Sequence, residues 1–311
     1  MQLFRMCAAS LLAAATMLAT GQAMAAPADG SSERPLRVLL IPADGGTESG
    51  TKADYQPVFN AITRTTGLHF DLKVGQSYGA VVEGMCNQLA DIAFLGPVSY
   101  VQAHQRNCAQ LLAVGVEKGA SIYYAAMFAR ADAPINALTD LRGKRVAFGD
   151  INSTSSFTFQ VASMLSSGMN PARDLSALYM TGSHAGSLAA LVQGQADAAA
   201  LSFDSFNKAA NQGAVDPAKV KVIFKSEPIP YPPLAMNTRL TPELKSALKK
   251  AFATVHKAEG VTPDMLRGYG GARLDRFDTE FPEERFSGPA TRMALLTDEI
   301  KGEILAKAAK R

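Results

Sequence analysis

Four consecutive hydroxyl side chains form the group most suggestive of chemistry in this chain: Ser153, Thr154, Ser155 and Ser156. They follow an apolar stretch at residues 145–149 and precede apolar residues at helical spacing over residues 157–169. Hydroxyls at the first turn of a helix cap free backbone N–H groups. The same N–H groups, with the positive end of the helix dipole, bind anions. The run therefore indicates either a capped helix start or an anion site, and alone it does not decide between them.

Three further polar side chains stand where an apolar strand is expected to end: Tyr78, His184 and Asp204. His184 starts an expected helix between two glycines, which favours a ligand contact over the more usual core or surface histidine. Asp204 is interpreted either as a ligand contact at the mouth of a strand or as a helix cap. Tyr78 is interpreted either as a ligand contact or as a packing aromatic residue.

Residues 75–79 match the G-x-S-x-G turn of serine hydrolases, with Ser77 in the place of the nucleophile. Asp204 and His256 follow in the order that such an enzyme needs. However, no oxyanion-hole sequence is visible before the turn, and the turn recurs 106 residues later with a histidine in place of the tyrosine. A repeated helix start explains the motif without catalysis. We therefore expect a protein that is not an enzyme, with a serine hydrolase as the alternative.

The first residues predict that the protein is exported. Residues 1–25 hold one arginine, an apolar stretch and a final Ala-x-Ala sequence, which is the pattern of a cleaved secretory signal peptide. No later segment approaches the length of apolar residues that a membrane span needs, so we expect a soluble exported protein. Cys86 and Cys108 remain after the signal. An oxidising compartment allows a disulfide between them, and two buried thiols are the alternative.

Several other kinds of site find no support in the sequence. Residues 45–52 are glycine-rich but lack the G-K-[ST] order of a nucleotide-binding P-loop. The four histidines are scattered without metal-ligand spacing, so we expect no metal and no cofactor. Removing the signal takes away one arginine and no acid, leaving 30 basic and 28 acidic residues. With no basic stripe, we expect no nucleic-acid partner.

The elements that must position these residues follow an alternating pattern, which predicts an α/β fold with mostly parallel sheets. Strands are expected at residues 36–41, 70–74, 91–95, 146–148, 177–180, 198–201 and 220–224. Helices are expected at residues 55–65 and 80–88 and near Phe157 and Leu188.

An internal repeat organises these elements into two similar lobes. At a spacing of 106 residues, four pairs of residues match: Asp44 with Asp150, Thr47 with Ser153, Tyr78 with His184, and Asp91 with Asp197. Each match occupies the same place in its βα unit, although the identities are few and chance is the alternative. Because ligands bind beyond the carboxyl ends of parallel strands, the polar loops of the two lobes should face each other across a cleft.

The expected lobes divide the chain after the signal peptide into three parts. Residues 36–128 begin the first lobe, residues 129–229 form the second, and residues 230–311 return to the first lobe with the C-terminal helices. The chain should cross between the lobes near residues 123–127 and 229–234, and the prolines of the second stretch suit a hinge rather than a regular central strand.

With these residues in view, the chain resembles the phosphonate/phosphite-binding proteins of ABC import systems, within the type II periplasmic binding proteins. The resemblance covers residues 36–304 and is carried by residues 88–96, 150–155, 182–184 and 226–230. It implies that Ser153, Thr154 and Ser155 grip the phosphonate oxygens, and that His184, Tyr78 and Asp204 also contact the ligand. The chain departs from the family at Leu95, where some members carry a contacting tyrosine, and at Ser156, where glycine is common.

The resemblance also implies the biological role. It predicts a periplasmic, monomeric solute-binding protein with a two-lobed fold that captures a phosphonate or phosphite and delivers it to a membrane permease. Asp204 would then accept a proton held by the ligand or pair with an ammonium group on it. A binding protein for another small anion, such as a sulfonate or thiamine phosphate, is an alternative with the same fold.

Overall fold

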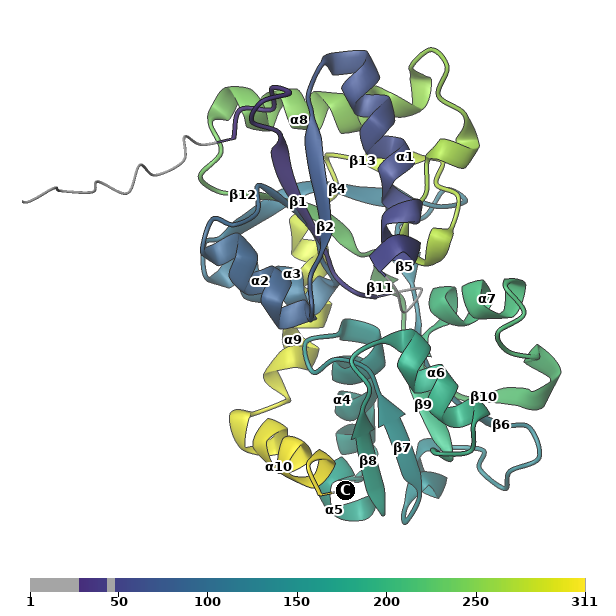
Figure 1. Ribbon diagram of the computed structural model, residues 1–311. Coiled ribbons are helices and arrows are strands. Elements are labelled where there is room, and N and C mark those ends of the chain that lie inside the picture. The colour runs from purple at the N-terminus through teal and green to yellow at the C-terminus, as the bar shows by residue number, and fades with distance from the viewer. Residues whose placement is uncertain (1–27, 44–47, 311) are drawn as a thin grey trace, which may run out of the picture.

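The computed structural model describes residues 28–43 and 48–310 and has two lobes, each built on one sheet (Figure 1). The expected signal peptide at residues 1–25, Asp44 and Thr47 lie outside the described residues. The sheet of the first lobe has the strand order β13-β4-β12-β3-β1-β2. Its strands are β1 (Leu36–Leu40), β2 (Phe70–Val74), β3 (Ile92–Phe94), β4 (Ala109–Val116), β12 (Pro233–Asn237) and β13 (Arg276–Asp278).

The sheet of the second lobe has the order β10-β6-β9-β7-β8. Its strands are β6 (Ala125–Arg130), β7 (Arg145–Phe148), β8 (Ala177–Met180), β9 (Ala198–Ser202) and β10 (Val220–Lys225). In each lobe three neighbouring strands run parallel, β2-β1-β3 and β8-β7-β9, and the next strand, β12 or β6, runs antiparallel to them. The two sheets therefore have the same plan.

Helices cover both faces of each sheet, so the central strands are buried on both sides. Every residue of β3 and β9 is buried. The first lobe carries α1 (Glu48–Thr66), α2 (Tyr78–Cys86), α3 (Pro97–Gln105) and α8 (Pro242–Thr254). The second lobe carries α4 (Phe159–Ser166), α5 (Pro171–Asp174), α6 (His184–Val192) and α7 (Phe203–Asn211). The apolar side chains of the two lobes form separate main cores.

Matching ion pairs explain one of the repeated residues in the sequence. In the first lobe, Arg37 near the start of β1 donates three hydrogen bonds to the carboxylate of Asp91. The donors are its backbone N–H, Nε and Nη2, at 2.7–2.8 Å. In the second lobe, Arg145 at the start of β7 holds Asp197 in the same way, at 2.7–3.2 Å. Both aspartates precede a central strand, so each pair fixes the end of its sheet that lies away from the cleft.

The helix starts repeat as well. Ser77 caps α2 by accepting a hydrogen bond from Ala80 N at 3.0 Å, and Ser183 caps α6 by accepting one from Gly186 N at 3.0 Å. Ser77 and Ser183 share an extended backbone, with φ of −154° and −151°. The serine of the G-x-S-x-G turn is thus a helix cap with a counterpart in the other lobe.

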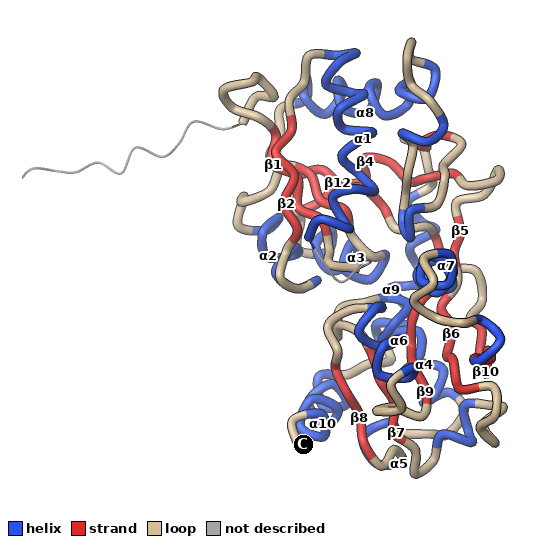
Figure 2. The backbone as a smooth tube through the Cα atoms, turned by 45° about the vertical axis from the view of Figure 1, so that its right-hand side comes forward, coloured by secondary structure: helices blue, strands red, loops and turns tan. Residues whose placement is uncertain are grey.

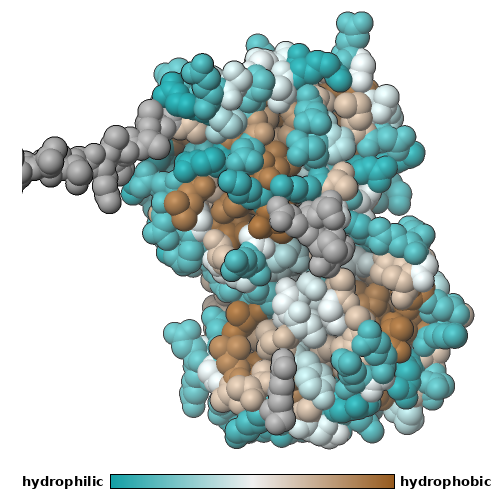
Figure 3. All heavy atoms as spheres, in the orientation of Figure 1, coloured by the Kyte–Doolittle hydropathy of each residue, from teal (hydrophilic) through white to brown (hydrophobic). Residues whose placement is uncertain are grey.

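Two strands form the hinge. β5 (Ile122–Tyr123) and β11 (Ile229–Pro230) pair antiparallel where the chain passes between the lobes. The molecule narrows at this level in the space-filling view (Figure 3). β6 already belongs to the sheet of the second lobe, although residues up to 128 were expected in the first.

The C-terminal helices differ from the expectation that residues 230–311 return to the first lobe. α8 does pack on the first lobe, against β4 and β13. α9 (Ser287–Ala294) contacts α3 of the first lobe and α4 of the second, and α10 (Asp298–Ala308) packs on β8 and α5 of the second lobe. Figure 2 shows α10 beside β8. The reason is burial of Leu296 and Ile304 in the core of the second lobe, so a third segment links the lobes.

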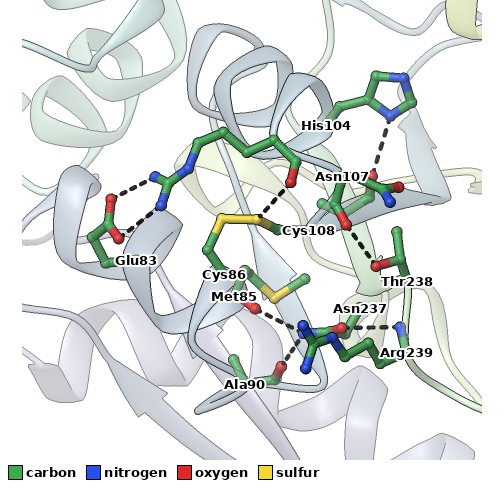
Figure 4. Close-up of a disulfide and its surroundings, with 12 residues drawn as sticks. Glu83, Met85, Cys86, Ala90, His104, Asn107, Cys108, Asn237, Thr238 and Arg239 are labelled. Carbon is green, nitrogen blue, oxygen red and sulfur yellow. Dashed lines mark hydrogen bonds and ion pairs between the residues drawn. A yellow bond between two sulfur atoms is a disulfide. The ribbon is translucent and has the colours of Figure 1, made fainter.

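A disulfide joins Cys86, the last residue of α2, to Cys108, which directly precedes β4 (Figure 4). Asn237 binds the carbonyl oxygens of Met85 and Ala90 beside it, at 2.8 and 3.1 Å. This end of α2 is therefore fixed to the sheet by covalent and hydrogen bonds. Among the described helices, none is long and apolar enough to cross a membrane.

Candidate functional site

The expected site residues lie where the two lobes meet. Tyr78 and His184 are the first residues of α2 and α6, and Asp204 is the second residue of α7. Each of these helices follows a strand of its sheet, so its first turn lies at the strand's carboxyl end. Ser153, Thr154 and Ser155 lie in the turn after β7. That these residues contact a ligand remains a prediction.

The hydroxyl run caps and begins a short π-helical turn rather than an ordinary α-helix. The π-helical turn, η2, spans Thr154–Thr158 and leads directly into α4. Ser153 caps it by accepting a hydrogen bond from Ser156 N at 3.2 Å. All four hydroxyl side chains of the run are at most 2% exposed. Because π-helical turns are uncommon and often occur at functional sites, this geometry adds to the evidence from the sequence.

Thr154 links the two lobes. Its Oγ1 accepts a hydrogen bond at 2.8 Å from the backbone N–H of Val98, in the first turn of α3. The cap residue of α3 is Gly96, which has no side chain to do this. A hydroxyl of the second lobe therefore caps a helix of the first. Because the oxygen accepts from Val98, its own hydrogen can be donated to an acceptor in the cleft.

Two further residues of the same loop bind the first lobe. Asp150 accepts hydrogen bonds from Tyr78 N at 3.2 Å and from Asn152 N at 2.8 Å, while burial raises the pKa of its carboxyl group. Asn152 accepts from Ser99 Oγ through its carbonyl at 2.9 Å, and from Gln102 Nε2 through its side chain at 3.0 Å. The loop that carries the hydroxyl run thus makes several hydrogen bonds between the lobes. The sequence indicated Asp150 as a repeated residue and as part of the resemblance, but not as a contact between the lobes.

His184 is fully buried and uses both ring nitrogens within the protein. Nδ1 accepts a hydrogen bond from Ser202 N at 3.1 Å, so the proton lies on Nε2, which is 2.9 Å from Tyr269 Oη. Burial lowers the pKa of the imidazole to about 3, because desolvation disfavours the charged ring. The ring is therefore neutral near pH 7 and donates a hydrogen bond to Tyr269.

Tyr269 was missed by the sequence analysis. It lies in the loop Gly268–Gly271, which belongs to the first lobe and packs on α7 of the second. Gly270 and Gly271 have φ of +67° and +68°, a backbone conformation that favours glycine. The sequence pattern that indicates this residue is Gly-Tyr-Gly-Gly, an aromatic residue in a glycine-rich loop.

Asp204 lies under the same loop. A Cβ atom on Gly270 would lie 2.9 Å from Asp204 Cβ, so the loop rests directly on this residue. Nearby, Lys208 of α7 pairs with Asp54 of α1 at 2.5 Å, and both side chains are 12% exposed. The first lobe thus contacts the start of α7 through the glycine loop and through a nearly buried ion pair.

The two positions that depart from the resembled family have structural roles. Leu95 is buried, and its N–H donates to Pro233 O at 3.0 Å. Ser156 lies behind the loop, where Gly149 N donates to its carbonyl oxygen at 3.3 Å. Its Oγ is buried without a hydrogen-bond partner among the described residues. Neither departure removes a donor from Thr154 or from the helix starts.

The chemistry that this arrangement supports is recognition of an oxyanion by neutral donors. The hydroxyl loop lies against the N-termini of α2 and α3, and the buried histidine at the start of α6 carries no charge. Within residues 28–43 and 48–310, no group of three or more His, Cys, Asp or Glu side chains is arranged to hold a metal ion.

Comparisons with known proteins agree on one family. Residues 46–280 match the family described as "ABC transporter, phosphonate, periplasmic substrate-binding protein". The phosphate-import protein PhnD of Mycolicibacterium smegmatis is 33% identical over 231 residues, which are 70% of this chain and 71% of the relative. The phosphonates-binding periplasmic protein of Escherichia coli is 26% identical over 230 residues, 72% of this chain and 67% of that one.

Solved structures share the fold. A binding protein component of an ABC phosphonate transporter from Pseudomonas aeruginosa superposes with a TM-score of 0.74 at 20% identity, covering 89% of this chain and 90% of its own. PhnD1 from Prochlorococcus marinus, solved in complex with methylphosphonate, gives 0.70 at 16% identity, covering 84% and 97%. The two-lobed fold expected from the sequence is therefore that of periplasmic binding proteins.

Proposed function

Because the chain belongs to the phosphonate-binding family of periplasmic ABC-transporter substrate-binding proteins, we propose that it captures a phosphonate or a related phosphorus oxyanion such as phosphite. It then delivers this ligand to the permease of an ABC importer, and it acts as a monomer without catalysis. The observation that carries the proposal is the buried hydroxyl loop of the second lobe, held against the helix N-termini of the first.

Ser153, Thr154, Ser155 and the neighbouring backbone N–H groups donate to the phosphoryl oxygens in this proposal. Hydrogen bonds to charged groups contribute roughly 1.5–3 kcal/mol each. Several of them suffice for micromolar binding, about −8 kcal/mol, after the cost of ordering the ligand and the lobes. Tyr78 and His184 shape the same region as the first residues of α2 and α6.

Asp204 has a different proposed role, since a carboxylate beside an oxyanion repels it unless a proton or a cation lies between them. We assign it the acceptance of a proton held by the ligand, or pairing with an ammonium group on the ligand. The first role rejects sulfate, which holds no proton at neutral pH. Replacing Asp204 by Asn tests it: discrimination against sulfate should shrink.

The proposed route to the periplasm is export through residues 1–25 followed by their removal. The Cys86–Cys108 disulfide supports this route, because disulfides persist in oxidising compartments. Ligand contacts from both lobes favour the closed arrangement, since a ligand shifts the population toward the state that it binds better. The closed form is what the permease would recognise.

Calorimetric titration with phosphite, methylphosphonate, phosphate, sulfate and an alkylsulfonate is the experiment that tests this function. We expect at least one phosphorus oxyanion to bind with micromolar affinity or better, and the paired change Ser153→Ala with Thr154→Ala to weaken it at least tenfold. Phosphate belongs in the panel because the M. smegmatis relative is named for phosphate import. Tight binding of the sulfonate alone, or unchanged affinity in the paired variant, would contradict the proposal.

A further inference from the structure

Tyr269 belongs to the first lobe and contacts His184, one of the expected ligand-binding residues of the second lobe. Its ring lies 6.2 Å from that of Phe94, centroid to centroid, at the end of β3. Two residues further on, Gly96 faces Thr154: a Cβ atom on this glycine would lie 3.2 Å from Thr154 Oγ1. Phe94 and Gly96 thus form one wall that runs from Thr154 to Tyr269.

The hydroxyl of Tyr269 is surrounded by polar atoms of the second lobe. His184 Nε2 lies 2.9 Å from it, Ser202 Oγ 3.1 Å and Ser205 Oγ 3.3 Å. All four side chains are buried, with Tyr269 only 2% exposed. Tyr269 therefore occupies the space beside His184 and the start of α7.

The ring of Tyr269 is also held firmly in place. It packs edge-on against Tyr123 and Tyr231, with centroids 5.5 and 6.5 Å away. Tyr231 donates its hydroxyl hydrogen to the carbonyl oxygen of Tyr269 at 3.1 Å. Both neighbours lie at the hinge crossings, so the position of the ring is set by the same residues that connect the lobes.

We propose that Tyr269 is the specificity-determining residue that ends the ligand pocket, restricting ligands to phosphorus oxyanions with no substituent or only a methyl group. This inference rests on the proposed function and names the substrate class of the same site. A longer substituent pointing away from the hydroxyl loop meets the Tyr269 ring and its hydrogen-bonded partners.

The test is a calorimetric series with phosphite, methylphosphonate, ethylphosphonate, propylphosphonate and 2-aminoethylphosphonate on the natural protein, Tyr269→Ala, Tyr269→Leu and Tyr269→Phe. The natural protein should bind ethylphosphonate at least tenfold more weakly than methylphosphonate. Tyr269→Ala removes the ring, so it should reduce the ratio of the Kd for ethylphosphonate to the Kd for methylphosphonate at least threefold. Tyr269→Phe should keep the ratio, because the ring remains.

Tyr179→Ala, at the edge strand β8 outside the cleft, is the matched control and should leave the ratio unchanged. Thermal melting establishes folding, and Tyr269→Leu replaces Tyr269→Ala if the latter does not fold. Tight binding with equal affinity along the series, or an unchanged ratio in both truncated variants, overturns the role of Tyr269 alone. If the natural protein binds none of these five ligands and no phosphate either, the proposed function and this inference are overturned together.

Discussion

At the residue scale, single side chains serve both lobes at once. Thr154 caps a helix of the first lobe from a loop of the second, and His184 bonds Tyr269 across the same boundary. Such residues have two roles, because the atom that would meet a ligand is also part of the contact between the lobes. Their substitution should therefore affect both ligand affinity and the contact between the lobes.

Replacing Thr154 by Val keeps the shape of the side chain but removes its hydroxyl. Val98 N–H then loses its acceptor and the ligand loses a donor, so we expect affinity for the ligand to fall at least tenfold, about 1.4 kcal/mol. Calorimetry measures this change. Thr63→Val on α1, where the hydroxyl bonds Phe59 O within the helix, is the matched control. Equal affinity in the two variants would argue against Thr154 in the site.

Burial of His184 makes stability depend on pH. The folded imidazole has a pKa of about 3 against 6.5 for the free side chain, so between these values the unfolded chain binds a proton that the folded chain does not. The contribution of the neutral His184 ring to the free energy of unfolding is therefore fully present above pH 6.5. Below that pH it falls by about 1.4 kcal/mol per pH unit, which is about 2 kcal/mol at pH 5.

His184→Asn should remove this dependence. Urea unfolding at pH 7 and pH 5 measures the loss of stability on acidification, which we expect to be smaller in the variant than in the natural protein by about 2 kcal/mol. His69→Asn, at the first lobe before β2, is the control and should keep the natural loss. The same loss in His184→Asn as in the natural protein would show that the ring is not buried in its neutral form.

At the element scale, the π-helical turn η2 packs tightly against the end of β7. A Cβ atom on Gly149 would lie 2.2 Å from Ser156 Oγ and 2.9 Å from its Cβ. Gln160 braces the turn from behind by donating to Ser155 O and Ala126 O, both at 2.9 Å. The position of the hydroxyl run thus depends on a close approach of strand and turn.

Gly149→Ala should push the turn away from β7. We expect it to lower the free energy of unfolding by about 1–3 kcal/mol, as overpacking does, and to weaken ligand binding. Adding Ser156→Gly removes the clashing atoms and should restore most of the stability. Gly302→Ala in α10, where a Cβ atom meets nothing within 4 Å, is the control. A double variant no more stable than Gly149→Ala alone would refute the packing argument.

At the scale of the whole molecule, the lobes meet through several polar contacts and three connecting segments. The ion pair of Asp54 with Lys208 is one of the least exposed of these contacts. In a buried ion pair, each charge offsets the cost of removing the other from water. Removing one partner therefore leaves the other as an uncompensated buried charge. Opening the cleft would hydrate both groups, so loss of one partner should favour the open arrangement.

Lys208→Met should therefore weaken ligand binding, because apparent affinity falls with the fraction of closed molecules. We expect a fall of at least fivefold, with a larger radius of gyration by X-ray scattering, and partial recovery when Asp54→Asn is added. Arg106→Met breaks the exposed Arg106–Glu83 pair within the first lobe and is the control, since exposed pairs contribute about 0–1 kcal/mol. Unchanged affinity and dimensions in Lys208→Met would exclude a role in closure.

The sequence by itself predicted seven strands of the two sheets, the two similar lobes and the hydroxyl loop, but not the strands β4, β6, β12 and β13. Residues 70–74 and 177–180 were predicted as the strands that the structure contains, because alternation and helical spacing are local properties of the chain. Serines before Tyr78 and His184 likewise mark helix starts through contacts only three residues away.

Only the tertiary structure decided which residues of the two lobes meet. Thr154 binds Val98 across 56 positions of sequence, and Tyr269 binds His184 across 85. α10 joins the second lobe because Leu296 and Ile304 are buried there, which no local spacing indicates. These contacts form because the hinge brings two separately packed cores together, so their partners depend on the geometry of the whole chain rather than on neighbours in sequence.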